Sequence, residues 1–153
     1  MAKSLNAMNM LLELAQRKLN QAAEVLAKAN HDVAEARQQL LSLETFRQEY
    51  IIQQNNLATD GINIKDFNNY SIFIKNIDQA IEAQKQTIDH FLAIAKHHTQ
   101  HWQICQTKKR SFEVVLEKNH RQQQKLASQR EQKQMDEFSS NQHRTALASS
   151  QRT

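Results

Sequence analysis

The chain has 153 residues, of which 39% are hydrophobic, and it contains one glycine and no proline. A compact globule of this size needs more apolar material to fill its interior, so this composition favours long helices or a coiled coil. The formal charge of +4 is uneven, because residues 1–95 carry 9 Lys or Arg and 11 Asp or Glu, whereas residues 96–153 carry 11 and 5.

The first predicted element is a helix over about residues 4–57. Apolar residues recur there at alternating steps of three and four, which is the period of a left-handed coiled coil. Arg47 alone interrupts this seam, and alanine holds every second seam position through the middle four heptads, where it lets a partner helix approach closely. The seam residues are Leu5, Met8, Leu12, Ala15, Leu19, Ala22, Leu26, Ala29, Val33, Ala36, Leu40, Leu43, Arg47 and Tyr50.

A bend is predicted over about residues 58–65. Gly61, the single glycine, can adopt a positive φ without penalty, and the neighbouring Asp and Asn residues favour turns. Asn63 or Asp66 is a plausible N-cap for a following helix. A short link of this kind makes the two helices antiparallel neighbours.

The second predicted helix covers about residues 66–140. Its seam is richer in bulky residues, which suits a partner lined with alanine, and it fades beyond Leu116. Residues 141–153 have no sustained pattern, and we expect a frayed tail there. The seam residues are Phe67, Tyr70, Ile74, Ile77, Ile81, Gln84, Ile88, Phe91, Ala95, His98, Trp102, Cys105, Lys109, Phe112 and Leu116.

Together these elements predict an all-α fold, an antiparallel two-helix coiled coil or long α-hairpin whose second helix is the longer, forming a single domain over residues 1–153. Residue i of the first helix should face roughly residue 120 − i of the second. This register pairs Tyr50 with Tyr70 and Leu43 with Ile77, and brings Leu19 near Trp102. Residues 117 to about 138 then form a polar, basic overhang without a partner in their own chain, and a helix of this kind is marginal alone.

Few residues invite a chemical interpretation. His97 and His101 are spaced for one helical face, but two histidines without a third ligand make a weak metal site. Cys105 lies on the seam as a small apolar residue, and a lone cysteine excludes an internal disulfide and suits a reducing cytoplasm. The basic run 108–110 is best interpreted as a solvated face. No phosphate-binding loop or nucleophile constellation is present, so no enzyme, metal or cofactor is predicted.

Aromatic residues gather near the predicted bend. Tyr50, Phe67 and Tyr70 fit the seam, whereas Phe46 and Phe73 do not. Exposed aromatic side chains at helical spacing are typical of interfaces. Packing at the end of the coiled coil and a docking surface are equally compatible with this pattern.

Several segments resemble the flagellar type III export protein family FliJ. They are "QQLLSLETFRQEY" at 38–50, "GINIKDFNNYSIFIKNIDQAI" at 61–81, Trp102 followed six residues later by Lys-Lys-Arg, and "QKQMDEF" at 132–138. The similarity runs in order over about residues 4–144. The resemblance implies a non-enzymatic, stalk-like component of the bacterial flagellar export apparatus. It also implies a location in the cytoplasm, at the cytoplasmic face of the inner membrane.

The resemblance further implies partners and the residues that meet them. The open end of the hairpin would insert into the hexameric export ATPase FliI, whose regulator is FliH, and a surface near the bend would meet the linker of the export gate FlhA. Export chaperones are also implied, without a position. The ATPase-ring residues would be Leu5, Met8, Leu12, Arg121, Lys125, Arg130, Lys133, Met135 and Phe138; the gate residues would be Gln39, Leu43, Phe46, Tyr50, Phe73, Ile77, Ala80 and Gln84.

Other interpretations stay open at this point. The chain could be the stalk of a non-flagellar injectisome, which shares the architecture. Its basic half could instead bind nucleic acid or an anionic membrane surface, or the chain could be a structural spacer that dimerises through its overhang. The preferred interpretation expects no nucleic acid, only indirect membrane association, and a monomer when free, because the intramolecular seam is already occupied. The N-terminus lacks the long apolar segment of a secretory signal, and no apolar run suggests a membrane span.

Overall fold

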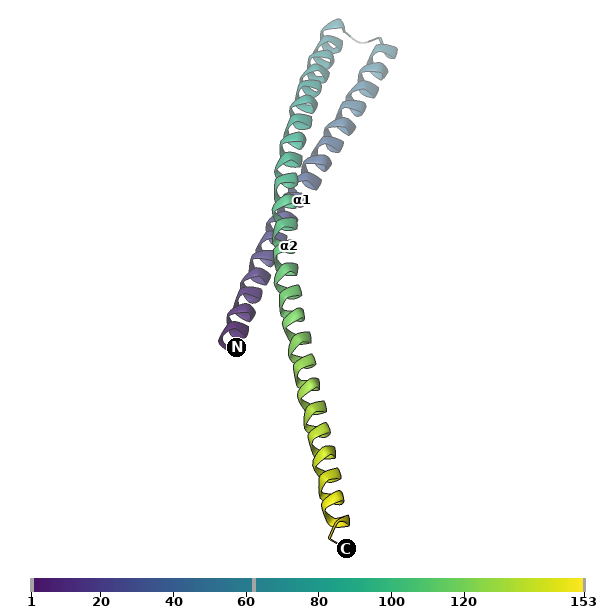
Figure 1. Cartoon of the computed structure of the whole chain (residues 1–153). Coiled ribbons are helices and arrows are strands. Elements are labelled where there is room, and N and C mark those ends of the chain that lie inside the picture. Colours follow the sequence, from purple (N-terminus) through teal and green to yellow (C-terminus); the bar gives the residue numbers. More distant parts are fainter. Residues whose placement is uncertain (1, 62, 153) are drawn as a thin grey trace. The chain divides into compact units, whose positions relative to one another are not determined.

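The structure is a computed structural model that describes residues 2–61 and 63–152. Two helices account for almost all of them, α1 over Ala2–Thr59 and α2 over Ile64–Ser150, and no strand occurs in the described ranges (Figure 1). The predicted fold class, an all-α antiparallel two-helix coiled coil with a longer second helix, is confirmed. No helix in these ranges combines the length and apolar character needed to cross a bilayer.

Contacts divide the chain into two compact units. Unit 1 comprises residues 1–16 and 107–153, and unit 2 comprises residues 17–106. Unit 2 therefore holds the bend and the two helical arms that it joins. The single-domain organisation stays a prediction. Residue 62 of the predicted bend, residue 153 of the predicted tail and residue 1 lie outside the described ranges.

The bend in unit 2 has the glycine conformation that the sequence requires. Gly61 has a φ of +76°, in the left-handed region that favours glycine. The carbonyl of Asn63 accepts backbone hydrogen bonds from Asp66 at 3.1 Å and Phe67 at 3.3 Å, so Asn63 occupies the N-cap position of α2. Asp66 lies in the first turn instead, where its charge complements the helix dipole. The bend is shorter than predicted, because α1 continues to Thr59 and α2 begins at Ile64.

The heptad seam forms the core of unit 2. The buried side chains are small on α1 and mostly larger on α2: Ala22, Ala29, Val33 and Ala36, and Ile81, Ile88, Ala95 and Cys105. Every predicted seam residue of the first helix is buried or half-buried, and so is every one of the second helix through Leu116 except Phe67. Phe67 is 40% exposed because it lies in the first turns of α2, where little of the hairpin remains to cover it.

The predicted register is confirmed at three levels of the hairpin. The rings of Tyr50 and Tyr70 lie 6.0 Å apart between centroids. The Gln84 side chain donates to the carbonyl of Ala36 at 2.9 Å. Ala29 belongs to the same cluster as Ala95, with Phe91 packed against it. Leu43, Ile77, Leu19 and Trp102 are all half-buried, as the register requires.

The C-terminal part of α2 departs from the prediction. The helix continues to Ser150, so the expected frayed tail from residue 141 is wrong for the described residues. This segment contains no glycine or proline, and the hydroxyls of Ser149 and Ser150 bond the carbonyls of Ala146 and Leu147 at 2.9 Å. From His120 to Arg152 every residue is exposed. The predicted overhang is therefore helical but has no buried face.

Candidate protein-interaction sites

Heptad labels describe the two edges of the hairpin in unit 2. With Leu5 and Phe67 taken as position a, each seam residue is an a or a d. Position g precedes a on one edge of the seam, and position e follows d on the other edge. In antiparallel helices, g positions of the two arms meet on the same edge, and so do e positions. The two edges of unit 2 have different chemistry.

The g edge carries an aromatic cluster close to the bend, formed by Phe46, Tyr50 and Phe73. The rings of Tyr50 and Phe73 are stacked, with centroids 5.9 Å apart and planes within 2°. Phe46 and Phe73, both at g, are 54% and 56% exposed. A hollow of about 400 Å³ opens beside them, lined by Tyr50, Leu57, Asp66, Asn69, Tyr70 and Phe73. The cluster therefore packs the seam through Tyr50 and also presents apolar surface to solvent.

All eight residues proposed for the export gate lie along this g edge. Leu43, Tyr50, Ile77 and Gln84 occupy d positions and are half-buried, whereas Gln39, Phe46, Phe73 and Ala80 occupy g positions and are exposed. The two sets are joined across the seam, because Gln84 donates to the Gln39 side-chain oxygen at 3.1 Å as well as to the backbone of Ala36. The d residues hold the two arms together, and the g residues are the ones available to a partner.

On the opposite edge, polar side chains join the two arms near the bend. Arg47, the one interruption of the apolar seam, pairs with Asp78 at an e position. Gln54 donates to the hydroxyl of Ser71 at 2.7 Å and to the carbonyl of Phe67 at 3.2 Å. The heptad pattern alone does not predict these three contacts. Gln54 lies seven residues after Arg47, and this heptad spacing of two polar residues is the signal in the sequence that could have indicated the polar contacts.

The residues proposed for the ATPase ring all belong to unit 1, and they fall into two groups. Leu5, Met8 and Leu12 are half-buried on the α1 seam, so packing already engages part of their surface. The other six are exposed along α2: Arg121, Lys125, Arg130, Lys133, Met135 and Phe138.

Met135 and Phe138 form the strongest apolar feature of the overhang, at 72% and 65% exposure. They line a shallow hollow of about 490 Å³ with Glu131, Gln134 and Ser139. These positions follow the i, i+3, i+4, i+7, i+8 spacing of one helical face. The overhang therefore has one apolar face with a polar border, which is the form that a helix takes when it docks in a groove.

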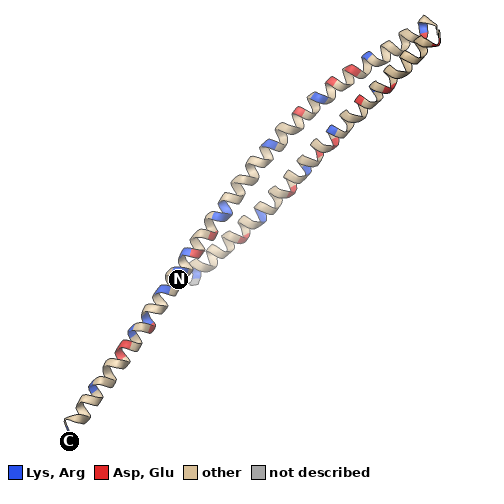
Figure 2. Cartoon of the chain, turned by 90° about the vertical axis from the view of Figure 1, so that its right-hand side faces the viewer, with Lys and Arg blue, Asp and Glu red and all other residues tan. Residues whose placement is uncertain are grey.

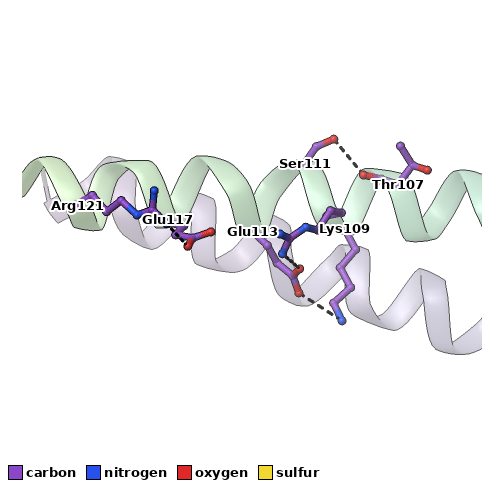
Figure 3. Close-up of polar contacts among 7 residues, drawn as sticks. Thr107, Lys109, Ser111, Glu113, Glu117 and Arg121 are labelled. Carbon is purple, nitrogen blue, oxygen red and sulfur yellow. Dashed lines mark hydrogen bonds and ion pairs between the residues drawn. The ribbon is translucent and has the colours of Figure 1, made fainter.

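Three ion pairs lie on α2 around the start of the overhang. Glu113 forms ion pairs with Lys109 and Arg110, each at 3.4 Å, and Glu117 forms one with Arg121 at 2.8 Å (Figure 3). Pairs three or four residues apart support the helix itself. Figure 2 shows both signs of charge interspersed along the helices. Within the described ranges, Lys125, Arg130 and Lys133 form no ion pair, so their charges are available to an acidic partner.

The histidine-rich stretch offers no metal-binding cluster. The rings of His97 and His98 lie 5.5 Å apart, and His101 Nε2 lies 3.7 Å from the sulfur of buried Cys105. Among the described residues, no three His, Cys, Asp or Glu side chains are grouped to hold an ion. The Cys105 position on the seam, predicted from the heptad pattern, is confirmed by its burial.

Comparison with known proteins gives consistent results. The family described as "Flagellar FliJ protein" matches residues 4–148. A protein of that name from Escherichia coli strain K12 is 25% identical over 135 residues, which cover 86% of this chain and 90% of that protein. The protein of the same name from Salmonella typhi is 29% identical over 147 residues, with the same coverage of 86% and 90%. No solved structure matches the chain.

Proposed function

Because the chain belongs to the flagellar FliJ family, we propose that it is a non-enzymatic stalk that connects the export ATPase ring to the export gate. Family membership makes it a component of flagellar protein export. The finer proposal is that the overhang of α2 enters the hexameric ATPase FliI, whose regulator is FliH. The g edge near the bend engages the linker of the gate FlhA. Export chaperones are further proposed partners, and contact with the membrane is indirect.

The exposed overhang is the observation that carries this proposal. Its residues from 120 to 150 form a helix with no buried side chain, and an isolated helix gains little stability from its own hydrogen bonds. The overhang carries the apolar face at Met135 and Phe138 and, on other faces of the helix, Lys125, Arg130 and Lys133, which form no ion pair in the described part of the chain. A pore with apolar and acidic lining would complement both features. The flagellar family match favours this partner over an injectisome ATPase or a nucleic acid.

Ring insertion would couple assembly to binding by simple linkage. A stalk that binds the closed hexamer, and not the separate subunits, stabilises the hexamer in proportion to its occupancy. Hydrolysis that requires the closed ring then rises with stalk concentration. In unit 2, the exposed rings of Phe46 and Phe73 would anchor the gate linker, because aromatic side chains at the centre of an interface often dominate its affinity.

Truncation after Leu116 tests the ring proposal. The seam ends there, so the hairpin is expected to fold without the overhang, and stimulation of hydrolysis by the cognate ATPase should be lost. The finer test replaces Met135 and Phe138 by alanine, which should lower apparent affinity for the ring by on the order of tenfold.

Leu126→Ala is the matched control for this pair. Leu126 is 51% exposed and lies nine residues before Met135, roughly half a turn away around the helix. It should leave stimulation of hydrolysis unchanged. Full stimulation by the truncated chain would remove the overhang from the mechanism.

A further inference from the structure

A second hollow lies on the g edge of unit 2, farther from the bend than the aromatic cluster. It encloses about 460 Å³ and is lined by Glu24, Val25, Lys28, Ala29, Asp32, Ile94 and His98. Val25 and Ile94 occupy g positions on the two arms, as Phe46 and Phe73 do near the bend. Val25 is 46% exposed, and Ile94 packs against the core cluster of Ala29, Val33 and Ala95. Both hollows therefore lie on the g edge, and each includes an apolar g residue of α2, Phe73 in the first and Ile94 in the second.

The spacing of the g edge suits a third helix. Val25, Asp32, Gln39 and Phe46 recur at intervals of seven residues on α1. A helix packs on a coiled coil most closely when its own contacts repeat with the same heptad period. The distance from Val25 to Phe46 is about 32 Å along the helix, which a partner helix of roughly 20–25 residues would cover. Between the hollows, Ala80 is exposed and small and would let such a helix approach.

The net charge of this edge indicates the sign of the charge that its partner should carry. Between Val25 and Gln53 on α1 and between Asp66 and His98 on α2, positions c and g carry four carboxylates and one lysine: Asp32, Glu35, Glu49 and Asp66, against Lys28. Over the same spans, positions b and e on the opposite edge carry four acidic and four basic residues. In the described part of the chain, the four carboxylates of the g edge form no ion pair, whereas Asp78 on the other edge is paired with Arg47.

We propose that the aromatic cluster is one end of a longer docking groove. A basic amphipathic helix of the partner lies along the g edge from Phe46 and Phe73 to Val25 and Ile94. Its apolar ridge fills both hollows, and its cationic side chains meet the free carboxylates. This inference rests on the proposed function, because the partner is taken to be the linker of the export gate.

The test measures binding of the full chain to the cytoplasmic region of the cognate gate, including its linker, by calorimetry. Val25→Arg removes an apolar contact and adds a positive charge to the acidic edge, and should weaken binding on the order of tenfold. Leu41→Arg is the matched control: Leu41 is 62% exposed at position b on the opposite edge of the same helix, and its replacement should leave affinity within about twofold.

A second pair of variants tests the charge of the partner separately. Glu35→Lys with Glu49→Lys should weaken binding and reduce its dependence on salt, whereas Glu44→Lys on the e edge should do neither. Circular dichroism should show equal helicity for all variants, since the replaced side chains are exposed.

The outcomes separate the two proposals. The Phe46→Ala, Phe73→Ala double variant reports on the gate contact alone. If that variant weakens binding while Val25→Arg and Leu41→Arg behave alike, the longer groove is wrong and the gate contact stands. If binding is tighter after charge reversal at Glu35 and Glu49, the basic partner helix is wrong. No binding by the unaltered chain would overturn the gate contact, and the groove with it.

Discussion

At the scale of single residues, Gly61 decides where the chain reverses. Its φ of +76° is accessible to glycine at no steric cost, whereas a residue with a side chain is destabilised by about 1–2 kcal/mol in this conformation. A Cβ atom added at this position would meet nothing within 4 Å. The penalty for a side chain is therefore confined to the backbone, and no packing change complicates it.

Gly61→Ala should lower the free energy of unfolding by about 1 kcal/mol, measured by urea denaturation. Gly61→Asn should lower it less, because asparagine tolerates the left-handed region better than alanine. Equal stability of the alanine variant and the unaltered chain would show that the bend has another conformation in solution.

At the scale of the helices, stability depends on a close approach along the alanine positions of α1. The exposed fractions of Ala22, Ala29 and Ala36 are 4%, 6% and 2%. The carbonyl of Ala36 accepts a hydrogen bond from the Gln84 side chain of α2. Bulky residues of α2, such as Ile81 and Ile88, fill the space that these methyl groups leave. Small seam side chains on α1 packed against larger ones on α2 therefore set the separation of the two arms.

Ala36→Leu should destabilise the hairpin by about 1–3 kcal/mol, because the added atoms must displace α2. Ala34→Leu, two residues away on the exposed surface, should change stability by less than about 0.5 kcal/mol. Thermal unfolding followed by circular dichroism measures both. Similar melting temperatures for the two variants would contradict close packing at Ala36.

At the scale of the whole chain, the length of α2 beyond the seam separates a packed part from an exposed part. Residues 120–152 have no buried side chain, so their helix depends on local propensity and pairs such as Glu117 with Arg121. Segments without tertiary contacts open most easily. The overhang is therefore the part of the chain that a partner would stabilise most.

Hydrogen exchange should show this difference directly. In the free chain, amides of residues 125–150 should exchange orders of magnitude faster than those of residues 22–36, and binding of the ATPase ring should slow the former selectively. The measurement should be made at a protein concentration at which sedimentation shows a monomer, because a monomer is the expected state of the free chain. Equal protection of both segments in the free monomer would contradict an unsupported overhang.

Much of this arrangement could be predicted from the heptad pattern. Alternating steps of three and four placed Ala22, Ile88 and Cys105 on the buried seam, and the location of Gly61 placed the bend and the register. Phe67 was misplaced because the pattern carries no information on where the covering arm ends. The tail beyond residue 141 loses the heptad periodicity but not the helix, because its composition contains no helix breaker.

The residues proposed for the export gate show the other limit of the sequence. Leu43 and Tyr50 were both seam and docking candidates, and the structure half-buries these d residues between the arms while leaving the neighbouring g residues exposed. The stacking of Tyr50 on Phe73 and the pairing of Arg47 with Asp78 depend on how far one arm is shifted and rotated against the other.

The sequence by itself determined the helical content, the seam and the point of reversal, since each follows from local preference or a repeat along one chain. The tertiary structure alone decided which edge became aromatic and acidic and which became polar and balanced. Those edges are made of side chains from both arms, and side chains distant in sequence become neighbours only when the two helices pack.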